Sequence, residues 1–206
     1  EIKNKVLARS SLNLVNVING TGIVLHTGFG RAPFNSKNIK NIAKKMHGYV
    51  NLEFNLNNGK RGDRQEHVRE ILSAICVSES SLVVNNNAAA VMLAINGIAK
   101  GGEVIVSRGE LVEIGGSFRI PDIIHASGAI LKEVGTTNRT HSRDYINAIN
   151  RNTKLILTVH TSNYIIKGFT KSVKLGELVS VGDKYNIPVM ADWGSESLLK
   201  NISKNT

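Results

Sequence analysis

The sequence predicts an α/β fold, with a mainly parallel β-sheet flanked by helices. Two nearly all-apolar runs, at 154–160 (KLILTVH) and 187–194 (IPVMADWG), are typical of strands buried on both faces. Segments with helical periodicity at 142–150 and 174–185 lie before and between them. This alternation favours βαβ crossovers, which place the carboxyl ends of all strands, and the ligand sites of such folds, at one edge of the sheet.

The first quarter of the chain precedes this alternation. Residues 17–34 contain four closely spaced glycines and read as a folded loop, and no G-x-G-x-x-G opens a helix there, so a dinucleotide site is excluded. Residues 35–47 predict an amphipathic helix with Ile39, Ile42 and Met46 on one stripe. An extended run at 52–56, a turn at Asn58–Gly59 and a helix from about Asp63 follow.

The stretch 81–121 organises the rest of the prediction. Leu82–Val84 is β-prone, three asparagines follow it, and 88–99 is rich in strong helix formers. A strand that leads through a polar turn into a helix N-terminus forms an anion site, because the free N–H groups point beyond the sheet edge. The alternative is an ordinary corner capped by asparagine. A second strand after the glycine turn at 101–102 and another strand at 128–134 continue the alternation.

Composition narrows the function classes. The 206 residues are 41% hydrophobic and 20% charged, which indicates a globular protein, and no apolar run is long enough to span a membrane. The net charge of +10, scattered along the chain, suits a polyanionic partner, but 5% aromatic content provides no stacking platform for single strands. The single cysteine, Cys76, is expected to be buried in the core and excludes an internal disulfide, so the cytosol is the expected compartment.

Polar residues follow each predicted strand. Asp192 ends the last strand, so the parallel topology places this acid at the same edge as the asparagine turn. A helix N-terminus for a phosphate and a carboxylate for a pyridine nitrogen are the two ends of a pyridoxal 5'-phosphate (PLP) site. No metal-ligand spacing is present. Arg61 and Arg64 flank Gly62 near a predicted helix start, where cations are disfavoured, and indicate an anionic partner or a solvent-facing pair.

Several long blocks then resemble one family, the bacterial selenocysteine synthases. They include INGTGIVLHTGFGRAP, NNGKRGDRQEHV, SRGELVEIGGSFRIPD and VHTSNYIIKGFT, and the resemblance extends from about Val17 to Ser197. It implies a fold-type I PLP-dependent enzyme, an L-seryl-tRNA(Sec) selenium transferase that is cytoplasmic and homodecameric. Such an enzyme converts seryl-tRNA(Sec) to selenocysteinyl-tRNA(Sec) with selenophosphate, through a PLP-bound aminoacrylyl intermediate.

The resemblance also implies roles for individual residues. Asp192 would hold the pyridine nitrogen protonated, and Arg61 and Arg64 would bind selenophosphate or the leaving phosphate. The remaining residues surround the cofactor: Asn86, Asn87 and Ala88 at its phosphate, and His160, Ser162 and Asn163 beside its ring.

The resemblance divides the chain at 16/17 and 80/81. Residues 1–16 would be a linker from a preceding tRNA-binding domain, 17–80 an arm with helices, and 81–206 a PLP-binding large domain, incomplete at its C-terminus. The family's Schiff-base lysine is expected beyond Thr206, so this piece alone is expected to be inactive. Lys200 is too close to Asp192 to replace it. The family's D-L-G-S-G-S appears here as DWGSES, with Trp193 and Glu196 as the departures.

Two other functions stay open. One is a related PLP-dependent lyase that acts on a small phosphorylated substrate, which the DWGSES departure favours. The other is an inactive remnant that serves oligomerisation or RNA binding. The basic composition of the chain favours this second alternative.

Overall fold

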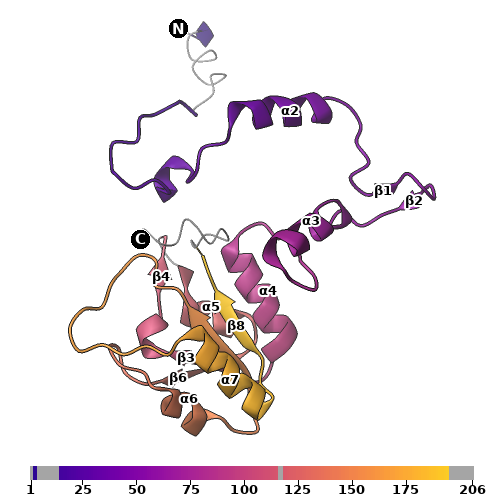
Figure 1. Cartoon of the computed structure of the whole chain (residues 1–206). Helices are drawn as coiled ribbons and strands as arrows, with labels where there is room; N and C mark the ends of the chain where they lie inside the picture. Colours follow the sequence, from indigo (N-terminus) through magenta and orange to yellow (C-terminus); the bar gives the residue numbers. More distant parts are fainter. Residues whose placement is uncertain (1, 4–13, 116–117, 195–206) are drawn as a thin grey trace. The chain divides into compact units, whose positions relative to one another are not determined.

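A computed structural model describes residues 2–3, 14–115 and 118–194. The chain divides into two units, Glu1–Asn51 and Leu52–Thr206 (Figure 1). Lys200 and Glu196 lie outside the described residues. The boundaries expected at 16/17 and 80/81 stay predictions.

The first unit contains the short 3-10 helix η1 (Thr27–Phe29) and the helix α2 (Ser36–Met46). Asn35 caps α2, since its side chain accepts from the Lys37 N–H at 2.9 Å. The helix predicted at 35–47 is therefore confirmed. The glycine-rich range 17–34 contains no strand, and Gly22 and Gly30 adopt positive φ angles of 77° and 80°, which suit a folded loop.

The second unit begins with a small hairpin and a helix. Strands β1 (Phe54–Asn55) and β2 (Lys60–Arg61) pair antiparallel around the predicted turn, where Gly59 has a φ of 70°. Helix α3 (Glu66–Cys76) starts three residues later than predicted. The Asp63 side chain accepts from the Gln65 N–H at 3.0 Å, and this local turn occupies the residues before the helix.

Cys76 is exposed, which corrects the expectation that it is buried. It is the last residue of α3, one turn after the half-buried Leu72, and the apolar residues Ile71 and Ile75 of the same helix are also exposed. Periodicity cannot say whether another element covers a face, and in the described part of the chain no residue of α3 is buried.

The core of the second unit is a four-stranded parallel sheet. Its order is β6-β3-β7-β8, and every neighbouring pair is parallel. The predicted parallel α/β architecture is confirmed. The bounds of these strands are β3 (Glu103–Ser107), β6 (Ile130–Val134), β7 (Thr153–Val159) and β8 (Val189–Asp192).

Helices cover both faces of this sheet (Figure 1). On β3, Val104 and Val106 pack into the cluster that includes α4 and α5, while Ile105 packs into the opposite cluster with residues of α6 and α7. Both faces are buried, which explains why the strands are apolar throughout. The helix bounds are α4 (Asn87–Ala99), α5 (Ile120–Ala126), α6 (Ser142–Ala148) and α7 (Leu175–Tyr185).

Helix α5 was not expected. The 3-10 helix η2 (Arg108–Glu110) and the antiparallel strands β4 (Glu113–Ile114) and β5 (Phe118–Arg119) precede it. Pro121 and Asp122 in its first turn are sequence signals of a helix start.

Leu82–Val84 is not a strand, although the sequence predicts one. The Gln65 side chain hydrogen-bonds both backbone groups of Val83: its Nε2 donates to the carbonyl oxygen and its Oε1 accepts from the N–H, each at 2.9 Å. The backbone is therefore satisfied by one side chain instead of a neighbouring strand.

Candidate functional site

The carboxyl ends of β7 and β8 are joined directly. Val159 and Asp192 are register partners, and the His160 N–H donates to the Asp192 carbonyl oxygen at 3.0 Å. The sheet therefore places His160 next to Asp192, as the parallel topology predicts.

The N-terminus of α4 meets the same edge. Asn87 Nδ2 donates to Asp192 Oδ1 at 2.7 Å across 105 residues of sequence, and Asp192 is only 6% exposed. Asn86 caps the helix, since its Oδ1 accepts from the Ala89 N–H at 2.8 Å. The asparagine turn and the acid that ends β8, which the sequence linked only by topology, are thus in contact.

This edge of the sheet offers a binding position for an anion, at the N-terminus of α4, and one for a cation, at Asp192. The N–H groups of Asn87 and Ala88 lie in the first turn of α4, before Ala90, whose N–H donates to the Asn86 carbonyl oxygen, and the helix dipole adds positive potential there. Asp192 supplies a buried carboxylate with one oxygen bonded to Asn87, and a carboxylate can accept further donors.

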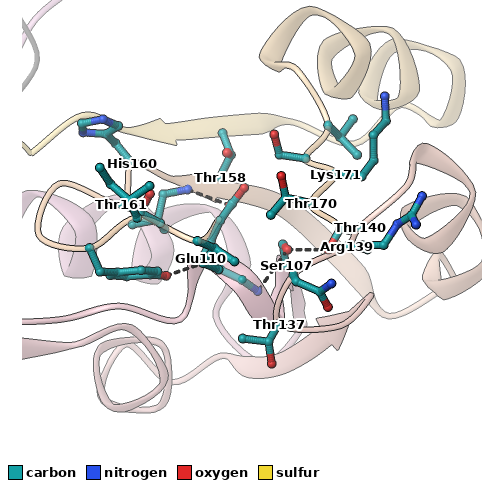
Figure 2. Close-up of a pocket in the computed structure, with 18 of the residues that line it drawn as sticks. Ser107, Glu110, Thr137, Arg139, Thr140, Thr158, His160, Thr161, Thr170 and Lys171 are labelled. Carbon is teal, nitrogen blue, oxygen red and sulfur yellow. Dashed lines mark hydrogen bonds between the residues drawn. The ribbon is translucent and has the colours of Figure 1, made fainter. Parts of the chain in front are cut away.

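A cavity of about 540 Å³ opens beside this edge (Figure 2). The ends of β3 and β7, the turn after β6 and the loop before α7 surround it. Its wall is rich in hydroxyl groups and also carries an acid, a histidine and two cations: Ser107, Glu110, Thr137, Arg139, Thr140, Thr158, His160, Thr161, Thr170 and Lys171 (Figure 2). Such a lining suits a polar, hydrogen-bonding ligand.

Glu110 is the acid of this wall. Its Oε2 accepts from the Val159 N–H at 2.9 Å, and the Thr158 hydroxyl donates to it as well. Burial raises the pKa of the Glu110 carboxyl, and these two hydrogen bonds only partly oppose the rise. The sequence places Glu110 after a strand but does not reveal that it bridges β3 and β7, because its partners are some 50 residues away.

A cluster of buried hydroxyl groups forms another part of the cavity wall. Ser107 Oγ and Thr140 Oγ1 are 2.7 Å apart, and Tyr145 hydrogen-bonds to Ser107. Burial, followed by the nearby charge of Glu110, raises the pKa of Tyr145. Gly135 closes the turn after β6 with a φ of 66°, and a Cβ there would lie 2.2 Å from Thr140 Oγ1, so only glycine fits.

The other residues predicted beside the ring lie on the loop after β7. The Ser162 N–H donates to the His160 carbonyl oxygen at 3.0 Å. Asn163 Nδ2 donates to the Glu113 carbonyl oxygen at 2.8 Å and so ties this loop to β4. His160 lines the cavity, whereas Ser162 and Asn163 are not among its lining residues.

Arg61 and Arg64 share one carboxylate. Arg61 Nη2 lies 2.5 Å from Glu53 Oε2, and Arg64 Nε donates to Glu53 Oε1 at 2.7 Å. The hydrogen bond and charge of Arg64 lower the pKa of Glu53. Both guanidinium groups stay largely exposed, and no bond among the described residues joins them to the edge that holds Asp192.

Metal binding and membrane crossing find no support in the residues that the structure covers. There, no three histidine, cysteine or acidic side chains gather as a metal site would need. In the same part of the chain, the helices are too short or too polar to cross a bilayer.

Solved structures share this architecture. D-Glucosaminate-6-phosphate ammonia-lyase matches with a TM-score of 0.67 at 20% identity, over 86% of this chain and 49% of that one. NtdA from Bacillus subtilis, solved with bound cofactor PMP, matches with a TM-score of 0.52 at 20% identity, over 76% and 32%. At this identity the likeness shows the fold alone, and it agrees with the predicted α/β fold of a mainly parallel sheet flanked by helices.

Sequence relatives are much closer. The L-seryl-tRNA(Sec) selenium transferase of Geobacter metallireducens is 53% identical over 96% of this chain, and that of Aquifex aeolicus is 52% identical over 99%. The chain spans only 43% and 45% of the lengths of these two relatives. The family described as L-seryl-tRNA selenium transferase matches residues 17–205. The chain belongs to the L-seryl-tRNA selenium transferase family.

Proposed function

We propose that this chain is the central part of a cytoplasmic, PLP-dependent L-seryl-tRNA(Sec) selenium transferase. Its substrates would be seryl-tRNA(Sec) and selenophosphate, and it would act as a homo-oligomer, a decamer as the family resemblance implies. The observation that carries the proposal is the contact between Asn87 and Asp192, which joins a helix N-terminus to a buried acid at the sheet edge. The family membership of residues 17–205 supports the same reading.

The described residues fit PLP at both of its ends. The first turn of α4, with Asn86, Asn87 and Ala88, offers N–H donors to the cofactor phosphate. Asp192 would hold a proton on the pyridine nitrogen, because a buried carboxylate favours a cationic partner. When bound, PLP supplies an electron sink that stabilises negative charge at the α-carbon of the seryl group.

The remaining residues have positioning roles in this proposal. His160 is fixed next to Asp192 by its own N–H and would lie beside the ring, with Ser162 and Asn163 on the loop that follows. Arg61 and Arg64 would bind selenophosphate. Glu53 uses only part of their donor capacity, since each guanidinium carries five N–H groups.

A lyase acting on a small phosphorylated substrate is the competing reading. It draws on the ammonia-lyase likeness, but that likeness is at 20% identity, whereas the selenium transferases are 52–53% identical. The transferase is therefore the better supported function.

Asp192→Asn tests the cofactor role. Equilibrium dialysis of the chain against PLP is expected to show binding that weakens at least about tenfold in this variant, because an amide cannot hold the ring nitrogen protonated. Asp183→Asn, at an exposed position on α7, is the matched control and should bind like the parent chain. Equal affinities for the Asp192 variant and the parent would contradict the assignment.

Transfer itself is tested in the full-length gene product. Seryl-tRNA(Sec) charged with labelled serine is incubated with selenophosphate, and the amino acid is released and identified. Selenocysteine is the expected product, and it should be lost in Asp192→Asn. Release of ammonia from a phosphorylated amino sugar, with no selenocysteine formed, would favour the lyase.

A further inference from the structure

The positive charge of this chain is concentrated in its first unit. Residues 1–51 contain eight lysines and arginines and one acid, a net charge of +7, whereas the rest contains eighteen and fifteen, a net charge of +3. The expectation that the charge is scattered along the chain is therefore wrong: most of the net charge lies in the first unit. An excess of this size within one segment points to a polyanionic partner for that segment.

Helix α2 carries half of these cations. Four of its eleven residues are lysines, and it contains no acid. At about 100° per residue, Lys37, Lys40 and Lys44 fall within roughly 60° of one another. They extend over about 10 Å of the helix axis at a rise of 1.5 Å per residue. We call these three residues the lysine face.

The lysine face has no internal partner in the part of the chain that the structure describes. None of its side chains takes part in an ion pair or a hydrogen bond within the described residues, and all three are exposed. The helix dipole accounts for Lys44, which lies in the last turn. It does not account for Lys37, since a cation in the first turn is disfavoured.

We propose that the lysine face binds the phosphate backbone of an RNA. The inference rests on the proposed function, in which a tRNA carries the reacting serine, and it names the surface that would hold that RNA. Lysines act as point charges toward phosphates and do not read sequence, so this surface positions the RNA and adds affinity.

An anionic membrane is the other polyanion that a basic amphipathic helix can fit. The opposite face of α2 is formed by Ile39, Ile42, Ala43 and Met46, which includes no aromatic anchor. Helices that lie in a membrane interface usually carry tryptophan, phenylalanine or leucine on that face. RNA is therefore the better match.

The test compares two triple variants of the full chain that lose the same charge. Lys37→Gln, Lys40→Gln and Lys44→Gln remove the lysine face. Lys100→Gln, Lys154→Gln and Lys184→Gln remove three exposed lysines near the amino ends of the sheet strands, away from the candidate site. Binding of a labelled tRNA(Sec) transcript is followed by fluorescence anisotropy from about 50 to about 200 mM salt, where phosphate contacts dominate the salt dependence.

The lysine-face variant is expected to bind at least about tenfold more weakly at low salt. Its slope of log affinity against log salt should be smaller by about 2, because each lost phosphate contact removes roughly 0.7–0.9. The control triple should keep the parent slope. Equal losses in both triples, or no loss in the lysine-face variant, would overturn the proposal.

Two further measurements separate the alternatives. A lysine-face variant that keeps tRNA binding but no longer binds vesicles with anionic lipid would replace RNA by a membrane and overturn the proposal. Asp192→Asn is expected to keep the salt slope of the parent chain. The tRNA-binding result can therefore be interpreted even if Asp192 turns out not to hold PLP. Circular dichroism of both triple variants is expected to show the helix content of the parent chain, because lysine and glutamine have similar helix propensities.

Discussion

At the scale of single residues, Glu110 shows how a distant contact sets the chemistry of a side chain. The carboxyl follows β3, yet its hydrogen-bond donors, Val159 and Thr158, belong to β7. Burial raises its pKa, so the folded chain holds the proton more readily than the unfolded chain does. Glu110 therefore lowers the stability of the fold once it ionises.

Glu110→Gln should remove this pH dependence. In the parent chain the contribution of Glu110 to the free energy of unfolding falls as the pH rises from its ordinary value of 4.5 through the raised pKa of the folded state. Glutamine keeps an acceptor for the Val159 N–H and does not ionise. Urea unfolding at about pH 4 and about pH 7 should show the variant gaining stability relative to the parent at the higher pH.

Glu79→Gln, at an exposed position, is the control and should show no comparable gain. The same pH dependence in both glutamine variants would mean that burial does not govern Glu110.

At the scale of elements, the segment before α4 shows a side chain replacing a strand pairing. Val83 has both backbone groups bonded to the Gln65 amide, so α3 and the segment 81–84 are held together without a β-ladder. Ser81 adds a third tie, since its Oγ donates to the Arg69 carbonyl oxygen at 2.8 Å. These contacts set the path of the chain into the asparagine turn.

Gln65→Leu should loosen that path. The variant loses both bonds to Val83 and is expected to lower the free energy of unfolding by about 1 kcal/mol, because water can replace part of the lost hydrogen bonding at this exposed residue. Hydrogen exchange of a peptide covering 81–86 should accelerate. Gln65→Glu can still accept from the Val83 N–H but cannot donate, so it should fall between the parent and the leucine variant; equal exchange in all three would contradict the tie.

At the scale of the whole molecule, burial differs sharply between the two units. The second unit has two hydrophobic clusters, one on each side of the sheet. In the first unit, no described residue is buried, and Ile39 and Met46 of α2 are 47% and 67% exposed. Local stability follows buried apolar contact, so the units are expected to open independently.

Hydrogen exchange of the whole chain should reflect this difference. The amides of β3 and β7 are expected to exchange last, and those of α2 within the earliest time points. If α2 exchanged as slowly as β7, its apolar stripe would be covered, and a concentration series would show whether a second copy covers it.

The sequence by itself determined the parallel α/β fold, the helix at 35–47 and the meeting of the asparagine turn with Asp192 at one sheet edge. These depend on side-chain periodicity, on capping residues and on the rule that parallel strands end on the same side, all of which are readable along the chain. The quoted blocks also identified the family, which the match to residues 17–205 confirms.

Only the tertiary structure decided which groups are buried and which side chain serves which backbone. The predicted strand at 82–84 is absent, and Gln65 bonds its backbone instead. Cys76 is exposed and not buried, and Glu110 lies in the wall of a cavity that the sequence did not predict. The physical reason is the same in each case. Burial and hydrogen-bond partners depend on segments far apart in sequence, as with Asn87 and Asp192, whose contact distance no local pattern encodes.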